Sequence, residues 1–407
     1  MARIESARIE NGKLLIAIDE GKIGQIYLTG NQRTHPFVIR RELPLKEGDL
    51  FNVSLLKKGT ENIYSTGYFD DIRFENIKLN RHYDLIFHLN EHGFTLVRTG
   101  LRYDLERLTK GFVQIVEENM LGYGYEGSLF ALAGKYDERF AARLKADRLF
   151  KTYMTFRTDL SASQKTIRYY KDLKSTGEYR HRIQSAGLVF GLQMQRLGTL
   201  SLQIKTENIM LKPISGDVPL NEKYTARSLT LCSEVDTRDH VPFPQNGKYH
   251  ILEYETGGEL LGSDISYVRI FSSMEFYLPL NKSIVLHPKV MWGTADLGTP
   301  FSKQFHLGGL DSFMGLPDDA LIGKRMIAFN GEIRFKIPWT ELLNSYFSIR
   351  CDLGSVWNKY EKITTNDFKQ GIGAILSLDT PLGPFHLGYG IMRDGLHQIY
   401  FSAGYQF

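Results

Sequence analysis

The chain ends in the sequence QIYFSAGYQF, residues 398–407. Apolar side chains occupy every second position of this stretch, namely Ile399, Phe401, Ala403, Tyr405 and Phe407. This alternation indicates a β-strand with one apolar and one polar face. Soluble proteins seldom end on a long strand because termini fray. A membrane-spanning barrel must pair its last strand with its first, since an unpaired edge in lipid is very costly. The ending therefore favours a membrane β-barrel that closes at its last strand.

Alternation of the same kind fills the chain from residue 93 onward. Within residues 200–207, for example, Leu202 and Ile204 lie on one face and Gln203 and Lys205 on the other. The polar faces carry charge on strand after strand, as a wide hydrated lumen permits. We count about sixteen strands of about ten or more residues, an even number and a length typical of outer-membrane barrels. A large soluble β-sandwich or propeller is the alternative.

The composition agrees with a barrel and excludes other classes of protein. Among the 407 residues, 12% are aromatic, and there are 38 Gly but only 13 Pro, which suits many strands joined by turns. No stretch approaches the roughly 18–20 continuous apolar residues of a membrane helix, and the mean hydropathy is −0.26. Lys and Arg number 50 and Asp and Glu 46, a balance that gives no electrostatic reason to expect a nucleic-acid partner.

Residues 22–92 differ from the rest and predict a small α/β domain. A strand over residues 23–30 ends at the turn pair Gly30-Asn31. The expected order of elements is strand, helix, helix, strand, strand. The other four elements are expected at residues 36–43, 53–66, 69–79 and 83–90.

Residues 1–21 are expected to form a strand that leads into this domain. The start of the chain has no apolar signal core, although an outer-membrane protein must be exported. We therefore interpret residues 1–21 as a strand and linker from a missing upstream region, and the chain as a fragment. Residues 93–407 are then the barrel.

Several motifs together resemble the outer-membrane superfamily that includes BamA, TamA, the two-partner secretion transporters and the patatin-fused PlpD-type proteins (the bacterial surface antigen family). The resemblance spans nearly the whole chain and is greatest to the N-terminal domain and barrel of a PlpD-type protein. It implies that residues 22–92 are a polypeptide-transport-associated (POTRA) domain with Gly30-Asn31 as its turn.

Within the barrel, the resemblance assigns four sets of residues. They are a strand-end motif (Asp236, Arg238, Asp239), a lumen-loop motif (Gly308, Gly309, Phe313, Met314, Gly315, Leu316), a barrel-wall motif (Asp352, Gly354) and a C-terminal assembly signal (Phe401, Gly404, Tyr405, Phe407).

The lumen-loop motif departs from the family pattern. The family carries an Arg where this chain has Met314. In the family, that Arg projects from a loop in the lumen and pairs with carboxylates of the barrel wall, a charge-assisted contact. Met314 cannot make this pair. Asp352 is therefore expected to pair with Lys324 or Arg325, or to stay hydrated.

Three functions remain open. The sequence carries no nucleophile elbow, no zinc-protease helix motif and no phosphate loop, so we expect no enzymatic activity, no cofactor and no metal. The first function is an outer-membrane anchor that translocates or displays a passenger, expected to be patatin-like. The second is a BamA- or TamA-like insertase that templates new strands at the seam between the first and last strands. The third is a passive porin-like channel.

The expected location is the bacterial outer membrane, with the N-terminal domain in the periplasm. The expected partners are outer-membrane lipids, the barrel assembly machinery that inserts the chain itself, and a passenger or client protein. Nucleic acid is not expected, and a homodimer is left open.

Overall fold

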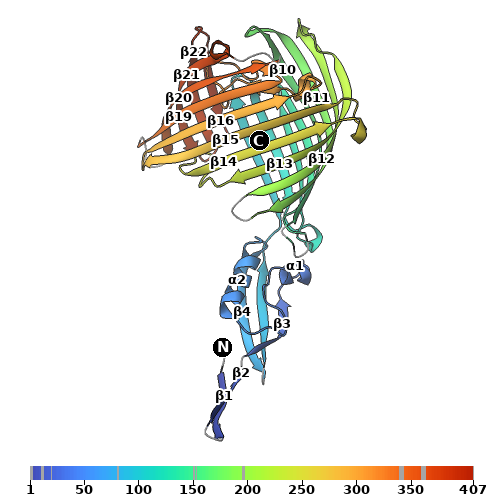
Figure 1. The fold of residues 1–407 in the computed structure, drawn as a ribbon, viewed down its shortest axis with the longest axis vertical. Helices are drawn as coiled ribbons and strands as arrows, with labels where there is room; N and C mark the ends of the chain where they lie inside the picture. Colours follow the sequence, from blue (N-terminus) through green and yellow to red (C-terminus); the bar gives the residue numbers. More distant parts are fainter. Residues whose placement is uncertain are drawn as a thin grey trace. The chain divides into compact units, whose positions relative to one another are not determined.

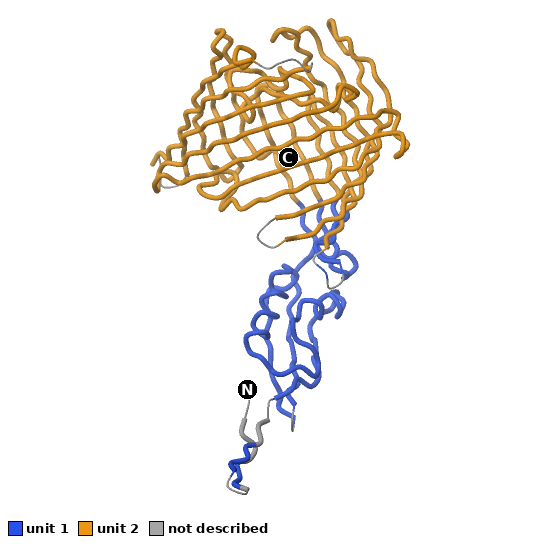
Figure 2. Tube along the Cα trace, in the orientation of Figure 1, with its two compact units in different colours: residues 1–97, 115–128, 144–152 blue, residues 98–114, 129–143, 153–407 orange. Residues whose placement is uncertain are grey.

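A computed structural model of the chain describes residues 3–10, 13–19, 21–79, 82–149, 152, 154–194, 198–338, 343–358 and 364–406 (Figure 1). The chain divides into two compact units (Figure 2). One unit comprises Met1–Val97, Ile115–Ser128 and Leu144–Thr152, and the other Arg98–Gln114, Leu129–Arg143 and Tyr153–Phe407. Within the described part of the chain, no helix is both long enough and apolar enough to cross a membrane.

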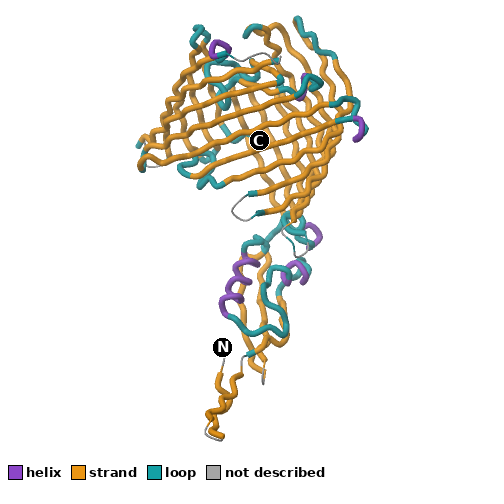
Figure 3. Tube along the Cα trace, viewed as in Figure 1, coloured by secondary structure: helices purple, strands orange, loops and turns teal. Residues whose placement is uncertain are grey.

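The first unit contains the α/β domain, in the expected order of elements (Figure 3). Its sheet has the order β3-β5-β4, with β3 parallel to β5 and β4 antiparallel to it. The elements are β3 (Lys22–Thr29), α1 (Pro36–Arg40), α2 (Val53–Tyr64), β4 (Phe69–Leu79) and β5 (His82–Glu91). The core between helices and sheet consists of Ile23, Ile26, Ile39, Leu43, Leu45, Leu56, Ile63, Phe69, Leu85, Phe87 and Leu89.

Local sequence explains where two of these elements begin and end. The Asn52 side chain accepts hydrogen bonds from the backbone N–H groups of Ser54 and Leu55, so it caps α2. After β3, Gly30 has a φ of +86°, and a Cβ atom there would lie 2.0 Å from the Leu89 carbonyl oxygen. Only glycine fits this turn, which accounts for the Gly30-Asn31 pair.

Residues 1–21 form two strands rather than the single strand that the sequence predicted. β1 (Arg3–Glu10) and β2 (Lys13–Asp19) make an antiparallel two-stranded sheet of their own. The sequence between them is Asn-Gly, a pair that strongly favours a two-residue hairpin connection. The two strands of this stretch therefore pair with each other.

Sixteen antiparallel strands of the described chain close into a barrel, as the sequence predicted. Around the barrel, β16 is followed directly by β19, because β17 (Phe305–Leu307) and β18 (Leu321–Gly323) pair with each other in the long loop between them. The barrel strands are β6 (Thr95–Asp104), β7 (Leu108–Glu117), β8 (Glu126–Gly134), β9 (Asp137–Ala146), β10 (Met154–Lys171), β11 (Lys174–Gln193), β12 (Thr199–Gly216), β13 (Glu222–Asp236), β14 (Gly247–Gly257), β15 (Tyr267–Asn281), β16 (Ile284–Ala295), β19 (Arg325–Ile337), β20 (Asn344–Trp357), β21 (Lys369–Thr380), β22 (Gly383–Met392) and β23 (His397–Ala403).

The two faces of the barrel strands follow the alternation in the sequence. On β12, Leu200 and Ile204 are 43% and 47% exposed, whereas Glu207 is 7% exposed and contacts the loop inside the barrel. Apolar side chains therefore face outward, where lipid would solvate them, and charged side chains face the lumen.

The last strand ends earlier than the sequence predicted. We expected it to run through residue 407, but β23 ends at Ala403. Gly404 has a φ of +103°, and a Cβ atom there would lie 2.1 Å from the Leu101 carbonyl oxygen, so the backbone turns out of the strand at a position that favours glycine. Phe407 lies outside the described residues.

Candidate functional site

The lumen loop, residues 296–324 between β16 and β19, contains the motif that departs from the family. Three of its residues, Phe313, Met314 and Leu316, are fully buried. The turn is compact because the Ser312 hydroxyl accepts from the Gly308 N–H at 2.9 Å and donates to the Gly308 carbonyl at 2.5 Å. The sequence therefore places its motif on a folded, packed segment of the loop.

Glycines of the barrel wall make room for this segment. A Cβ atom on Gly373 of β21 would lie 2.4 Å from Cε of Met314, and one on Gly390 of β22 would lie 2.4 Å from the Gly315 nitrogen. Gly371, two residues before Gly373 and so on the same face, would meet the Met314 carbonyl oxygen at 2.4 Å. The wall is thus hollowed to accept the loop backbone. These glycines were not predicted from the sequence, although the Gly-x-Gly spacing within a strand could have indicated them.

The side chain of Asp352 on β20 anchors the loop by binding the loop's backbone. Its Oδ2 accepts the Met314 N–H at 2.7 Å, and its Oδ1 accepts from Asn330 Nδ2 and from Arg350 Nε, both at 2.8 Å. The expected partner Lys324 instead donates to the Leu297 carbonyl. The expectation that Lys324 pairs with Asp352 was therefore wrong. A cation on the neighbouring inward position of β20, Arg350, is a charged partner of Asp352.

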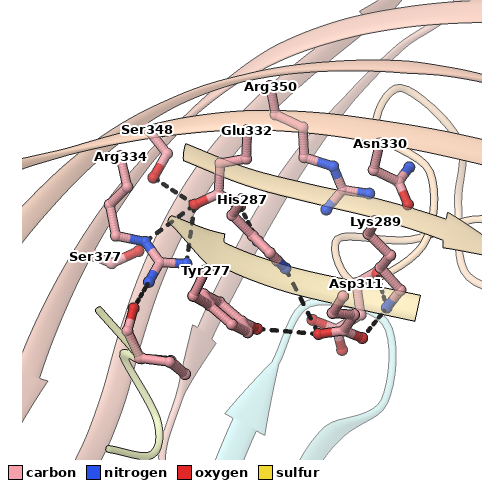
Figure 4. Close-up of polar contacts among 12 residues, drawn as sticks. Tyr277, His287, Lys289, Asp311, Asn330, Glu332, Arg334, Ser348, Arg350 and Ser377 are labelled. Atoms are coloured by element: carbon pink, nitrogen blue, oxygen red, sulfur yellow. Dashed lines mark hydrogen bonds and ion pairs between the residues drawn. The ribbon is translucent and has the colours of Figure 1, made fainter. Parts of the chain in front are cut away.

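Arg350 binds the loop and the wall at once. Its Nε donates to Asp352, and its Nη1 donates to the Leu310 carbonyl at 2.6 Å. In the register of β19 and β20, Arg350 lies opposite Glu332, and Asp352 opposite Asn330. These four side chains form an inward-facing row beneath the loop, three of which are labelled in Figure 4.

Gly354, the other residue of the barrel-wall motif, has a different role. A Cβ atom there would lie 2.6 Å from the Ile327 carbonyl oxygen and 2.8 Å from the Ala328 Cα. Gly354 thus permits the close approach of β19 to β20 and does not touch the loop motif in the contacts described above.

The first limb of the loop, the part between β16 and the motif, is held by a buried lysine. Lys303 is 7% exposed and lies against the carboxylates of Glu207 on β12 and Glu255 on β14, the latter at 3.0 Å. The Tyr267 hydroxyl also donates to Glu255, at 2.6 Å. Because two carboxylates compensate one ammonium group, this contact ties the loop to the wall far from the motif.

We define the seam of the barrel as the junction of β6 and β23. The far limb of the loop, from Leu316 to Asp319, contacts both edges of this seam. The Asp318 N–H donates to the Glu106 carboxylate at 3.0 and 3.1 Å, and Arg107 pairs with Asp319 at 3.0 Å, so the loop binds the β6–β7 turn. On the other edge, the Tyr400 hydroxyl of β23 donates to the Leu316 carbonyl at 2.7 Å.

The ladder pairing at the seam itself extends over only a short stretch of the two strands. In the described part of the chain, Ser402 and Ala403 pair with Asp104 and Tyr103, and the Leu105 N–H donates to the Phe401 carbonyl at 3.2 Å. On its other side, β23 pairs with β22 over its whole length, from His397 to Ala403. In this register most of β6 lies beyond the end of β23, and residues 397–401 of β23 lie beyond the end of β6. Among the described residues, these parts of the two edges have no ladder partner across the seam.

Phe401, a residue of the C-terminal signal, lies at this seam. The Phe401 ring lies 5.8 Å from that of Tyr103 and 5.0 Å from that of Phe385, so it bridges the strands on both sides of β23. Tyr405, beyond the bend at Gly404, is 50% exposed. Their part in assembly stays a prediction.

The strand-end motif stabilises the turn between β13 and β14. Arg238 donates to both oxygens of Asp236, at 2.9 and 2.6 Å, and its guanidinium lies 4.5 Å from the centre of the Tyr249 ring. Asp239 accepts the Gln245 N–H at 2.9 Å. These contacts close a ten-residue connection, Thr237 to Asn246, into a defined loop.

In the first unit, the POTRA-like domain is joined to two turns of barrel strands. Asn119, which follows β7, donates to the Thr34 hydroxyl at 2.8 Å, and Arg148, which follows β9, pairs with Glu42. Glu91 accepts the Thr34 N–H at 2.7 Å. Burial alone would raise the pKa of Glu91, but hydrogen bonds from Thr34 and Arg33 hold it below its ordinary value. The sequence analysis missed this joint because its partners are far apart in the chain.

Between the lumen loop and the β13–β14 turn lies a polar cavity of about 790 Å³. Glu332 is its central carboxylate: it accepts from Ser348 at 2.8 Å and pairs with Arg334 at 3.0 Å and with His287 at 3.4 Å (Figure 4). Lys289 also faces this space. Acidic and basic groups are balanced around the cavity, so its field favours neither anions nor cations strongly.

Comparisons with known protein families agree with this architecture. Residues 119–407 match the family model described as the Omp85 superfamily domain, and residues 21–92 match a POTRA model described as a surface antigen variable number repeat. The outer membrane protein assembly factor BamA of Nitratidesulfovibrio vulgaris is 23% identical over 397 residues, which cover 91% of this chain and 48% of that protein. BamA of Neisseria meningitidis serogroup B is 21% identical over 489 residues, which cover 99% of this chain and 59% of that protein. The chain thus spans about half the length of the curated relatives it matches.

Solved structures show the same fold at low identity. BamA from Haemophilus ducreyi lacking POTRA domains 1–3 matches with a TM-score of 0.81 and 15% identity, covering 99% of this chain and 89% of that one. CdiB from Escherichia coli matches with a TM-score of 0.65 and 14% identity, covering 98% and 79% of the two chains.

Proposed function

The chain belongs to the Omp85 superfamily, and we therefore propose that it inserts client β-barrel proteins into the outer membrane at the seam between β6 and β23. The family, the POTRA domain and the closed barrel place the protein in the outer membrane, with the POTRA domain in the periplasm. The relatives named above are assembly factors and a CdiB protein. They favour the insertase among the three expected functions and give no support to a patatin-like passenger.

The short pairing at the seam is the observation that carries this proposal. Two residues of β23 pair with β6, whereas seven-residue β23 pairs throughout with β22. Backbone N–H and C=O groups that are not paired across the seam can pair with an incoming strand by β-augmentation. A client strand added there would exchange one edge for another without exposing unpaired backbone to lipid. No catalytic step is required.

The interior of the barrel argues against a passive channel. The lumen loop is anchored to the wall at Asp352, at Glu207 and Glu255, and at the β6–β7 turn. Such a loop obstructs the lumen. The partners implied by the insertase function are unfolded client barrels in the periplasm and the barrel assembly machinery.

A disulfide across the seam tests the proposal. In a background with Cys232→Ser and Cys351→Ser, both free thiols in the native chain, we would introduce Tyr103→Cys with Ala403→Cys, which lie opposite each other. The matched control is Phe385→Cys with Ala403→Cys, which links β23 to its permanent neighbour β22. The assay is folding of a urea-unfolded eight-stranded barrel by proteoliposomes of the full chain, followed by heat-modifiable gel migration.

We expect the seam disulfide to abolish the acceleration of client folding, and reduction to restore it, while the control disulfide has no effect. If the oxidised seam variant accelerates folding as well as the reduced one, the seam is not the site. If the unlinked protein gives no acceleration at all, the insertase function is wrong.

A further inference from the structure

The β13–β14 turn, residues 237–246, does more than connect two strands. The Thr237 N–H donates to the Lys248 carbonyl at 2.9 Å, and the Asp239 N–H donates to the Asn246 carbonyl at 3.1 Å, which brings the two ends of the turn together. Between them, residues 240–244 form a projection that is apolar at its tip. An exposed connection would not need this degree of internal order.

Phe243, in this projection, is buried among side chains of other strands. It is 3% exposed, and its ring stacks on that of Tyr346 of β20 at 4.8 Å with an interplanar angle of 27°. The His386 ring of β22 lies 5.7 Å away, and the guanidinium of Arg334 lies 5.8 Å from the centre of the Phe243 ring. Arg334 Nη1 also donates to the Pro244 carbonyl at 3.3 Å. The turn is therefore held in a specific seat.

This seat lies on a different part of the wall from the strands that carry the turn. In the barrel order, β15 and β16 separate β14 from β19, and β20 to β22 lie further along. To reach Tyr346 and His386, the turn must cross the interior of the barrel instead of following the rim. Alternate connections of an antiparallel barrel lie at the same end, so this crossing is at the periplasmic mouth, the end of the β7–β8 and β9–β10 connections.

The cavity between the lumen loop and the β13–β14 turn also indicates that the turn reaches into the barrel interior. The lumen loop contributes Gly308, Leu310 and Asp311 to its lining, and the turn contributes Val241 and Phe243. The inward row of β19 and β20 runs from the loop anchor at Asn330 and Asp352 to the turn seat at Tyr346. Loop and turn thus occupy opposite ends of one row of side chains, with the cavity between them.

We propose that the β13–β14 turn is a periplasmic latch that closes the lumen from below, independently of the lumen loop. Phe243 is its seating residue, and Arg334, oriented by Glu332, is its positioning residue. Ions and solutes must displace both the loop and the latch to cross the barrel. The latch does not depend on whether the seam accepts client strands.

Conductance in planar bilayers tests the latch. Because the loop alone can block the lumen, the measurement uses the full chain with loop residues 309–319 replaced by a short Gly-Ser linker, with and without Phe243→Ala. The matched control is Phe347→Ala, which removes the same ring from the adjacent position of β20, where the side chain is 36% exposed on the opposite face. All variants are first checked for heat-modifiable migration, which reports a folded barrel.

We expect the loop replacement alone to conduct little, Phe243→Ala in that background to raise conductance several-fold, and Phe347→Ala to leave it unchanged. If the loop replacement alone conducts as much as the double variant, the turn is no barrier and the proposal fails.

If the loop replacement does not fold, thiol accessibility gives the same answer in a chain with an intact loop. Ser377 is 5% exposed and lines the cavity, and its side chain is similar in size to that of Cys. With Ser377→Cys in the Cys232→Ser, Cys351→Ser background, a membrane-impermeant maleimide added from the periplasmic side should react at least tenfold faster after Phe243→Ala. Equal rates with and without Phe243 would overturn the latch.

Discussion

Replacement of Met314 by Arg, the residue that the family carries at this position, tests the structure of the loop anchor. The Met314 side chain is fully buried against Ile375, Tyr400 and Leu310. Both oxygens of Asp352 are already occupied, one of them by the Met314 N–H. A guanidinium introduced here would be a second buried cation near Arg350 without a carboxylate of its own.

The cost of Met314→Arg follows from this geometry. An uncompensated buried charge destabilises by about 3–5 kcal/mol, and the cost falls on docking of the loop, because the barrel strands keep their backbone pairing. Since about 1.4 kcal/mol changes an equilibrium tenfold, the population of undocked loop should rise by roughly two to three and a half powers of ten. Met314→Leu, which conserves volume, should cost less than about 1.5 kcal/mol.

A thiol reporter in the loop measures this equilibrium. Ala320, four residues after the motif, is 6% exposed, so a cysteine there is protected while the loop is docked. In the Cys232→Ser, Cys351→Ser background, the rate of maleimide labelling of Ala320→Cys reports loop opening. We expect the Arg variant to label at least about tenfold faster than the Leu variant, since the two costs differ by at least about 1.5 kcal/mol. Labelling of the two variants within a few-fold of each other would show that the seat accepts an arginine, and the assignment of Arg350 as the charged partner of Asp352 would then be wrong.

Two further predictions concern stability in detergent or lipid. Leu202→Arg, on the outward face of β12, should destabilise the barrel by about 2–4 kcal/mol in lipid, whereas Gln203→Arg at the adjacent lumen position should be nearly neutral; equal costs in reversible unfolding titrations would contradict the assignment of faces. Lys303→Met removes the cation between Glu207 and Glu255, which keep Lys205 and Arg269 as partners. It should therefore destabilise the first limb of the loop by about 1.5–3 kcal/mol, measured as faster proteolysis of the loop, and Lys303→Arg should lose less.

The barrel could be predicted from sequence because lipid imposes a simple rule on it. Residues that face the hydrocarbon are predominantly apolar and every second residue of a spanning strand faces lipid, which produces the alternation around Leu202 or Ile333. The end of the last strand was predicted less well. Alternation continues through Tyr405 in the sequence, but Gly404 adopts a positive φ and ends the strand. Periodicity does not register a change in backbone conformation.

The position of the loop anchor could be predicted from sequence, but the partners of Asp352 could not. The motif at Gly308 to Leu316 was found by resemblance, and Met314 was seen to lack a charge. Which groups bind Asp352 depends on register: Arg350 is two residues from Asp352 on one strand, on the same face, and Asn330 is opposite it on another. Although β19 and β20 are consecutive strands, their register depends on where each strand ends and on the turn between them, which the alternation alone does not define. Phe243 was overlooked for a different reason: its seat is formed by strands about 100 residues further along the chain.

The contacts of the lumen loop stabilise the closed seam in addition to the pairing of its two strands. Few backbone hydrogen bonds join β6 to β23, and each contributes only about 0.5–1.5 kcal/mol net. The loop adds a partly buried ion pair between Arg107 and Asp319 on the β6 side, and the hydrogen bond of Tyr400 to Leu316 on the β23 side. Hydrogen bonds that involve charged groups contribute about 1.5–3 kcal/mol, so the loop stabilises the closed seam about as much as the strands themselves do. An opened seam must therefore lose at least one edge of the loop as well, which links the position of the loop anchored at Asp352 to the edge that a client strand would meet.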